Sequence, residues 1–331
     1  MNKKAQILII SLWILMILSI LAISIGHRVS MALRLSAYQK RRLQATYLAK
    51  AALTKARAVV SADSSAEYDG NRDQWADNET HFKKISLEGN EEGFATVSYT
   101  VVRNGQTHIV YGIQDEERNI NLNHASAETL TALLNMCNAP HAQELANEVL
   151  AWRGESSITV PEYQEMGYSN KGEEFSAIEE LIMVKNMTPE IYNSLKSLIT
   201  VYGAGKVNIN TAPKEVLMAL GLGAAKSDPQ IKENDAIELA ARIISFRDNE
   251  SGYFTTTELN TQKIREKLKL GDITSDEKTK IVDYLVTSGS IAAVTQTFRI
   301  EATGYCGKSR RRISVVIQRT DPPKILFWHE N

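Results

Sequence analysis

The stretch "ILIISLWILMILSILAISIG", residues 7–26, decides how the rest of the chain is interpreted. It contains 20 consecutive residues without a charge, and as a helix it would extend about 30 Å, the thickness of the hydrocarbon core of a bilayer. Its polar side chains are serines, which can bond to the carbonyls of their own helix. The stretch therefore predicts a membrane-spanning helix. The apolar side chains of this anchor include Ile7, Trp13, Leu18 and Ile25.

A cleaved secretory signal is the alternative interpretation, with Lys3 and Lys4 as its basic start. The apolar stretch is longer than the usual signal core, and no small-residue cleavage site followed by a loop ends it. The helical pattern instead continues, because no Gly or Pro occurs from His27 to Val60. We therefore predict one helix from about residue 6 to about residue 60, with its first half in lipid. The face that packs on a soluble body is predicted to contain Leu43, Tyr47, Leu48, Ala51, Ala52 and Ala56.

The overall composition argues against several classes of function. The formal net charge is -1 and the pI is about 6.6, so no overall basic field attracts nucleic acid. The two cysteines, Cys137 and Cys306, are compatible with one long-range disulfide or with two separate thiols. The histidines form no HxxxH or HExxH pair, and no serine stands in a GxSxG motif. We therefore expect no enzyme.

A short phrase occurs twice in the middle of the chain. Residues 120–133 and 207–220 share seven identities in fourteen aligned positions, and "ELANEVLAWRGE" from Glu144 matches "ELAARIISFRDN" from Glu238. Each copy is predicted to form a turn followed by two helices, with asparagines near the first helix as its caps. These cap residues are Asn121 and Asn123 in the first copy and Asn208 and Asn210 in the second.

A third helical hairpin is predicted between the two copies, in residues 176–203. Ser176 is expected to begin one helix and Thr188-Pro189 the next, and Tyr202-Gly203 to end the run. Units of this kind, which are helix-hairpin-helix-like, often bind DNA phosphates through a Gly-hydrophobic-Gly turn. Gly221-Leu222-Gly223 offers such a turn, although acidic residues follow it. DNA binding is therefore the alternative to a packing scaffold.

Strand patterns lie on both sides of this helical region. Alternating apolar residues from Phe94 to Val101, a turn at Asn104-Gly105 and a run from His108 to Ile113 predict one hairpin. A second hairpin is predicted from Phe298 to Ile317, with its turn near Gly307. The predicted fold is α+β: a long helix packs on one antiparallel sheet built from both hairpins, and a large all-α domain interrupts that sheet.

The order of these segments resembles the minor pseudopilin K family of type II secretion systems, within the type IV pilin-like superfamily. The resemblance covers nearly the whole chain. It is carried by "YLAKAALTKA", "DEERNINLNHAS", "EELIMVKNMTPEIYNSLKSLITVYG", "VNINTAPKEVL" and "FRIEATG". It implies a pilin-like subunit at the tip of a periplasmic pseudopilus, assembled with minor pseudopilins of the I, J and H types and with the major pseudopilin. It also implies a protein of the inner membrane with its body in the periplasm.

The resemblance also implies how the N-terminus is processed. The prepilin peptidase of this superfamily cuts before the apolar segment, usually after Gly, and the matching position is Ala5, so Gln6 would become the new N-terminus. Most pilins have Glu at the fifth mature position, where this chain has Ile10. The family is known for calcium in its inserted domain, and we assign no ligands to it from the sequence. The "DEER" run at Asp115 to Arg118 is interpreted as solvated charge at a domain junction, with calcium binding or capping of the inserted domain as alternatives.

These observations divide the chain into five parts. The parts are a leader, residues 1–5; the N-terminal helix, 6–60, with the span at 7–26; a first part of the sheet, 61–117; the inserted domain, 118–288, with repeats near 119–155, 176–203 and 206–249; and a second part of the sheet, 289–331.

Overall fold

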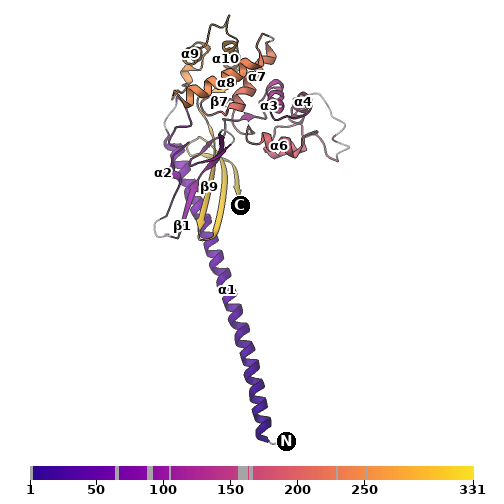
Figure 1. Ribbon diagram of the computed structural model, residues 1–331, viewed down its shortest axis with the longest axis vertical. Helices are drawn as coiled ribbons and strands as arrows, with labels where there is room; N and C mark the ends of the chain where they lie inside the picture. Colours follow the sequence, from indigo (N-terminus) through magenta and orange to yellow (C-terminus); the bar gives the residue numbers. More distant parts are fainter. Residues whose placement is uncertain are drawn as a thin grey trace.

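The computed structural model describes residues 3–63, 67–87, 92–103, 106–155, 163, 167–228, 230–250 and 252–331. Three parts follow one another along the long axis of the molecule (Figure 1). A long helix extends alone from the N-terminus, about its last third lies against a sheet, and a group of helices lies at the end opposite the N-terminus. This is the predicted α+β architecture.

Helix α1, Lys3–Ala62, is one uninterrupted element, which confirms the prediction of a single long helix. Its packing face differs in part from the predicted one. Leu48, Ala52 and Ala56 are buried as expected, but Leu43 and Tyr47 are 57% and 61% exposed. The face turns away from these two bulky residues because the sheet approaches the helix backbone closely: a Cβ added to Gly304 would lie 1.9 Å from the Ala45 carbonyl oxygen. The buried face consists of Ala45, Leu48, Ala49, Ala52, Leu53, Ala56 and Val60.

The main sheet is antiparallel and has the strand order β1-β9-β10-β11, with β4 also paired to β9. Its strands are β1 (Gly93–Val97), β4 (Gln114–Asp115), β9 (Thr297–Cys306), β10 (Ser309–Gln318) and β11 (Lys324–Glu330). The β9–β10 hairpin is the second predicted hairpin, and Gly307 in its turn has a φ of +55°, a conformation that glycine adopts without strain. Alternate residues of β9 and β10, including Ile300 and Val315, are fully buried against α1.

The first predicted hairpin is placed differently from expectation. Strands β2 (Tyr99–Arg103) and β3 (Gln106–Val110) do pair, but they form a separate two-stranded sheet. The main sheet receives β1 alone from this region, because β1 pairs with β9 and ends at Val97, and Ser98 separates it from β2. The turn residues Asn104 and Gly105 lie outside the described residues. Strand β11 was not predicted, because polar and apolar residues do not alternate in its sequence. Its four consecutive apolar side chains, Ile325 to Trp328, are all partly exposed.

The helical domain contains both copies of the repeated phrase, and each copy starts with a short strand rather than a turn. Strand β5 pairs in parallel with β6, and β7 pairs in the same way with β8. The elements of the domain are β5 (Ile120–Asn121), α3 (Ala127–Met136), α4 (Ala142–Trp152), η1 (Ile178–Met183), α6 (Pro189–Leu195), β6 (Ile199–Thr200), β7 (Val207–Asn208), α7 (Lys214–Ser227), α8 (Glu233–Asp248), η2 (Thr256–Glu258), α9 (Thr261–Leu268), α10 (Glu277–Thr287) and β8 (Ile291–Ala292). A continuous apolar core joins the two copies.

The hairpin between the copies is shorter than predicted. Thr188 caps α6 with its side chain and Pro189 is the first helical residue, as expected. The element after Ser176 is a 3-10 helix that starts at Ile178, and α6 ends at Leu195 rather than near Tyr202. The reason is that the β-branched residues Ile199 and Thr200 extend into strand β6 and pair with β5.

Candidate functional site

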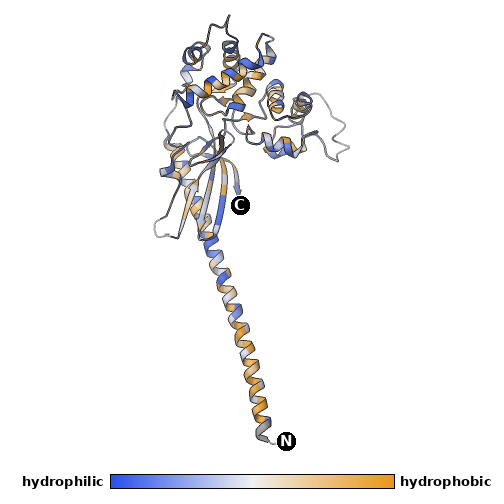
Figure 2. Ribbon diagram, viewed as in Figure 1, coloured by the Kyte–Doolittle hydropathy of each residue, from blue (hydrophilic) through white to orange (hydrophobic). Residues whose placement is uncertain are grey.

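The membrane anchor is the first candidate site. The segment from Gln6 has the length and apolar composition of a membrane-crossing helix, and Figure 2 shows its apolar character along the free part of α1. The predicted anchor residues are exposed: Ile7 is 67%, Trp13 61%, Leu18 60% and Ile25 61% exposed. Ile10, at the predicted fifth mature position, is 58% exposed. The Ala5–Gln6 bond lies in the first turns of this helix.

The repeated asparagines are buried and bond backbone groups of the turns and loops around them, and they do not cap helices. Asn121 Oδ1 accepts the Asn123 backbone N–H at 2.8 Å, and Asn208 Oδ1 accepts that of Asn210 at 3.0 Å. The predicted caps are wrong: Ser126 caps α3 with its side chain, and Pro213 occupies the N-cap position of α7. Asn121 and Asn208 are the last residues of the short strands β5 and β7, and Asn123 and Asn210 lie two residues beyond them, before the helices begin.

Asn123 and Asn210 each hold a distant segment by two backbone bonds. Asn123 bonds the C=O of Phe175 at 3.0 Å and its N–H at 2.8 Å. Asn210 bonds the C=O of Phe254 at 2.9 Å and its N–H at 2.8 Å. The same amide geometry therefore fixes the returning loop in both copies.

A pair of buried arginines completes this duplication. Arg153 donates to the Leu122 and Ala125 carbonyls, and Arg247 donates to the Ile209 and Ala212 carbonyls, both at 2.9 Å. Burial lowers the pKa of Arg247 to about 10. Each arginine satisfies the carbonyls of the turn between strand and helix, so the turn is held by charge-assisted bonds.

The glycine pair considered for phosphate binding lies inside a helix. Gly221 and Gly223 belong to α7, so they form no turn with free backbone amides. Their role is close packing: a Cβ on Gly221 would lie 2.9 Å from the Ala236 Cβ, and one on Gly223 would lie 2.6 Å from the Thr129 hydroxyl. The DNA-binding alternative therefore has no support at this position, because the glycine turn on which it rested is helical.

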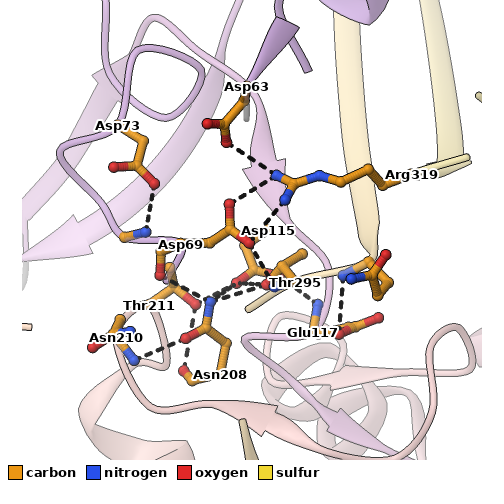
Figure 3. A network of polar contacts seen from close by, with 12 residues as sticks. Asp63, Asp69, Asp73, Asp115, Glu117, Asn208, Asn210, Thr211, Thr295 and Arg319 are labelled. Atoms are coloured by element: carbon orange, nitrogen blue, oxygen red, sulfur yellow. Dashed lines mark hydrogen bonds and ion pairs between the residues drawn. The ribbon is translucent and has the colours of Figure 1, made fainter. Parts of the chain in front are cut away.

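The junction between the sheet and the helical domain is a buried polar network (Figure 3). Asp115 is 3% exposed. Its Oδ2 accepts bonds from Asn208 at 3.0 Å, from Thr295 at 2.6 Å and from the Thr211 hydroxyl, and its Oδ1 accepts the Glu117 N–H at 2.8 Å. Burial raises the pKa of Asp115 although these donors oppose the shift. One carboxylate thus ties the second repeat to the sheet.

The next two residues extend the junction, and the expectation of solvated charge is wrong for them. Glu116 and Glu117 are 2% and 6% exposed. Glu116 forms a bidentate pair with Arg299, both bonds at 2.7 Å. Glu117 accepts the Thr297 hydroxyl at 2.9 Å, and burial raises its pKa to about 7, with a further contribution from Asp115. These residues are buried because they connect β4 of the main sheet to β5 of the helical domain and therefore lie where the two parts meet.

A third carboxylate group lies at the same junction. Within the described part of the chain, Asp63, Asp69 and Asp73 present oxygens within 4.8 Å of one another, and Figure 3 shows the Arg319 guanidinium beside them. Arg319 bonds Asp69 at 2.7 Å and Asp63 at 3.2 Å. Arg319 already bonds oxygens of two of the three carboxylates. Calcium takes six to eight oxygen ligands, so these three side chains by themselves supply fewer free oxygens than calcium needs.

The two cysteines are separate thiols. Cys137 is half-buried, Cys306 is buried, and both are free. Cys306 Sγ lies 3.4 Å from Gln44 Oε1, where the β9–β10 turn meets α1.

The chain is similar to protein K of type II secretion systems in part of its sequence and in its fold. Residues 107–204 match the family model for type II secretion system (T2SS) protein K. A chain of the crystal structure of the GspK–GspI–GspJ complex from the type 2 secretion system of enterotoxigenic Escherichia coli matches with a TM-score of 0.63 and 16% sequence identity, over 89% of this chain and 99% of that chain. No match was found among curated proteins. The structural likeness shows the fold, including the helical domain.

Proposed function

We propose that this chain, which is a GspK-like minor pseudopilin of the type II secretion system, is the structural tip subunit of the pseudopilus. In this role it starts assembly with other minor pseudopilins and caps the filament used for protein export across the outer membrane. The observation that carries the proposal is the position of the helical domain. It lies at the end of the molecule farthest from the N-terminus and spreads beyond the sheet (Figure 1).

The size of the helical domain supports the proposal that this subunit lies at the end of the filament. In a pilin-like filament the subunits are stacked with their N-terminal helices parallel, so the next subunit above would have to pass its own helix beside the sheet of this one. Here the helical domain extends over that space, above the end of α1 and of the sheet (Figure 1). A subunit with such a head can be extended from below and not from above.

Ile10 supports the same position. In the family model, Glu at the fifth mature position pairs with the terminal amine of a neighbouring subunit, and a buried carboxylate in lipid needs such a partner. Ile10 is apolar and 58% exposed on the free helix, so it neither needs nor offers this pair. A subunit with nothing above it loses nothing by lacking the carboxylate.

The exposed part of α1 is proposed as the surface for partner subunits. Beyond the span, Leu35, Tyr38, Leu43 and Tyr47 are all more than half exposed, and apolar burial against the helices of I-, J- and H-type partners and of the major pseudopilin would cover them. The crystal structure of similar fold contains GspI and GspJ beside GspK, which supports partners of the first two types for this chain.

We further propose that the leader is removed after Ala5 by the prepilin peptidase, with methylation of the new N-terminus at Gln6. The anchor then holds the protein in the inner membrane with its body in the periplasm. Calcium binding by the inserted domain stays a prediction of the family resemblance, with no ligands assigned to it. No enzymatic activity is proposed, because the buried carboxylates of the junction are occupied by structural bonds.

The proposal is tested by co-expressing the full chain with its I- and J-type partners and purifying the complex in detergent. We expect a stable complex containing all three chains. Replacement of Leu43 and Tyr47 by serine should weaken it, whereas Ser197→Ala on the helical domain should not. A chain that purifies without partners under conditions where the partners are folded would contradict the proposed role.

A further inference from the structure

The end of the body that faces the anchor carries many positive charges. The sequence has no acidic residue in positions 1–62 and none in 302–320. The β9–β10 turn lies against α1, because a Cβ on Gly307 would be 3.4 Å from the Arg41 Cδ. The fold thereby joins a basic run on the helix with the "KSRRR" run of the hairpin. We call this set the cationic collar, and it consists of Lys40, Arg41, Arg42, Lys308, Arg310 and Arg311.

The collar is not neutralised by its surroundings. The neighbouring acidic residues are already paired: Glu301 with Arg312 and Glu330 with Lys50, both at 3.1 Å. Among the described residues no ion pair includes a collar residue. Glu92 lies near this end, next to the residue that pairs with Cys306, and the other acids of its loop lie outside the described residues. Five of the six collar residues are exposed, and Arg311 is half-buried.

The cations of α1 continue from the collar down to the end of the span and point in all directions. Arg28, Arg34 and Lys40 are spaced by six residues, and a rotation of about 100° per residue places them about 120° apart around the helix. A partner helix would contact one side of α1. A membrane surface surrounds it on every side, so this distribution favours an anionic membrane over an acidic protein.

The distances allow this interaction. Lys40 lies 14 residues beyond Gly26, about 21 Å along the helix, and a tilt of about 40° reduces the height to about 16 Å. The headgroup layer occupies about 5–7 Å of this height. The remaining gap of about 10 Å is partly spanned by the long side chains and is close to the Debye length of about 8 Å at physiological salt.

We propose that the cationic collar binds anionic phospholipid headgroups of the leaflet from which α1 emerges, and holds the body against the membrane before assembly. The inference rests on the anchorage proposed above. Incorporation into a filament then requires the collar to leave the headgroups, so the lipid attraction opposes premature extraction.

The test uses the full chain in vesicles of phosphatidylcholine, with or without about a third of phosphatidylglycerol, and measures lysine acylation rates by mass spectrometry. We expect Lys40 and Lys308 to react about threefold more slowly, or slower still, in the anionic vesicles, because amines that contact the headgroups are less accessible to the reagent. Raising the salt to about 1 M, where the Debye length is about 3 Å, should remove the difference. Lys214 and Lys232 of the helical domain, both exposed, should react equally in both vesicles.

A matched pair of variants separates the collar from net charge. Arg41→Gln/Arg42→Gln/Arg311→Gln should reduce the protection of Lys40 and Lys308, whereas Lys206→Gln/Lys226→Gln/Lys269→Gln should preserve it. Equal rates in both vesicles would overturn the proposal, and protection that appears only when partner pseudopilins are added would assign the collar to a protein instead. A chain that does not float with either vesicle would refute the anchorage itself, which is a different failure.

Discussion

At the scale of single residues, the fold depends on buried polar side chains that each serve several backbone groups. Asn210, 3% exposed, bonds Phe254 twice and also donates to the Ala293 carbonyl at 3.2 Å. The repeat made these asparagines visible in the sequence, but their role was assigned wrongly, because Asn is also a common helix cap. The "DEER" run was misassigned for a similar reason: charged residues are usually exposed, and the side chains that bond Asp115 are 93 to 180 residues away in the sequence.

Replacement of Asn210 by alanine should destabilise the helical domain by about 2–4 kcal/mol. The substitution leaves the N–H and C=O of Phe254 without their Asn210 partners in a buried site, and each unsatisfied group costs about 1–3 kcal/mol. The Ala293 carbonyl loses one of two donors and keeps the Asp69 N–H at 2.8 Å. The free energy of unfolding in urea, measured on residues 27–331, checks this value. The exposed Asn249→Ala is the control, and equal stabilities of the two variants would contradict the bracing role.

Replacement of Glu117 by glutamine should flatten the dependence of stability on pH. Burial raises the folded-state pKa of Glu117 from 4.5 to about 7, so its stabilising contribution is fully present below about pH 4.5 and is lost as pH rises through 7. Asp69, with a pKa of about 6, acts in the same direction. Between about pH 5 and 8 the unmodified chain should lose about 2–3 kcal/mol more than Glu117→Gln. Parallel unfolding curves across this range would show that Glu117 does not titrate there.

At the scale of elements, the sequence predicted what has a long regular pattern and missed what depends on distant contacts. Helix α1, the β9–β10 hairpin and the helices of both copies have their own periodicity, and all are present. The short parallel strands β5 to β8 have two residues each, too few for any pattern. Their partners come from the far ends of the repeats. The buried face of α1 differs from the predicted face, because which residues are buried depends on how closely the sheet approaches the helix backbone.

Replacement of Gly304 by alanine should separate α1 from the sheet. The added Cβ would lie 1.9 Å from the Ala45 carbonyl oxygen and 2.9 Å from the Ala49 nitrogen, and backbone on both sides prevents a local adjustment. We expect a loss of about 1–3 kcal/mol or more, as for other overpacked cores. Unfolding of the full chain in detergent tests this, with Gly26→Ala as the control, because nothing lies within 4 Å of that position. A variant as stable as the unmodified chain would show that the contact is loose.

At the scale of the whole molecule, the order of parts could be predicted: an apolar anchor, a helix–sheet body and a helical domain inserted between strands of that body. How the domain is fixed to the sheet could not be predicted, because it depends on Asp115, Glu116 and Glu117, which reach β9 and the second repeat only after folding. These bonds connect the domain to the body at several points. We therefore expect the helical domain to stay over the sheet as one unit with it, as the proposed capping role requires.

Removal of residues 118–288 should change where the chain is placed and not whether it is anchored. Without the helical domain the space above α1 and the sheet is open, so the shortened chain should also appear within the shaft. Ile10→Glu, in contrast, should leave the chain at the tip, because the domain still blocks addition from above. Cross-linking to the major pseudopilin, followed by mass spectrometry of neighbours above and below, distinguishes the two. A shortened chain found only at the tip would show that bulk is not the cause.

The most direct test of the tip assignment is immunogold labelling of the helical domain on isolated pseudopili, viewed by electron microscopy. Filaments assembled with excess major pseudopilin should carry label at one end and none along the shaft. Label distributed along the length of the filaments, at a spacing set by the subunit repeat, would contradict the account.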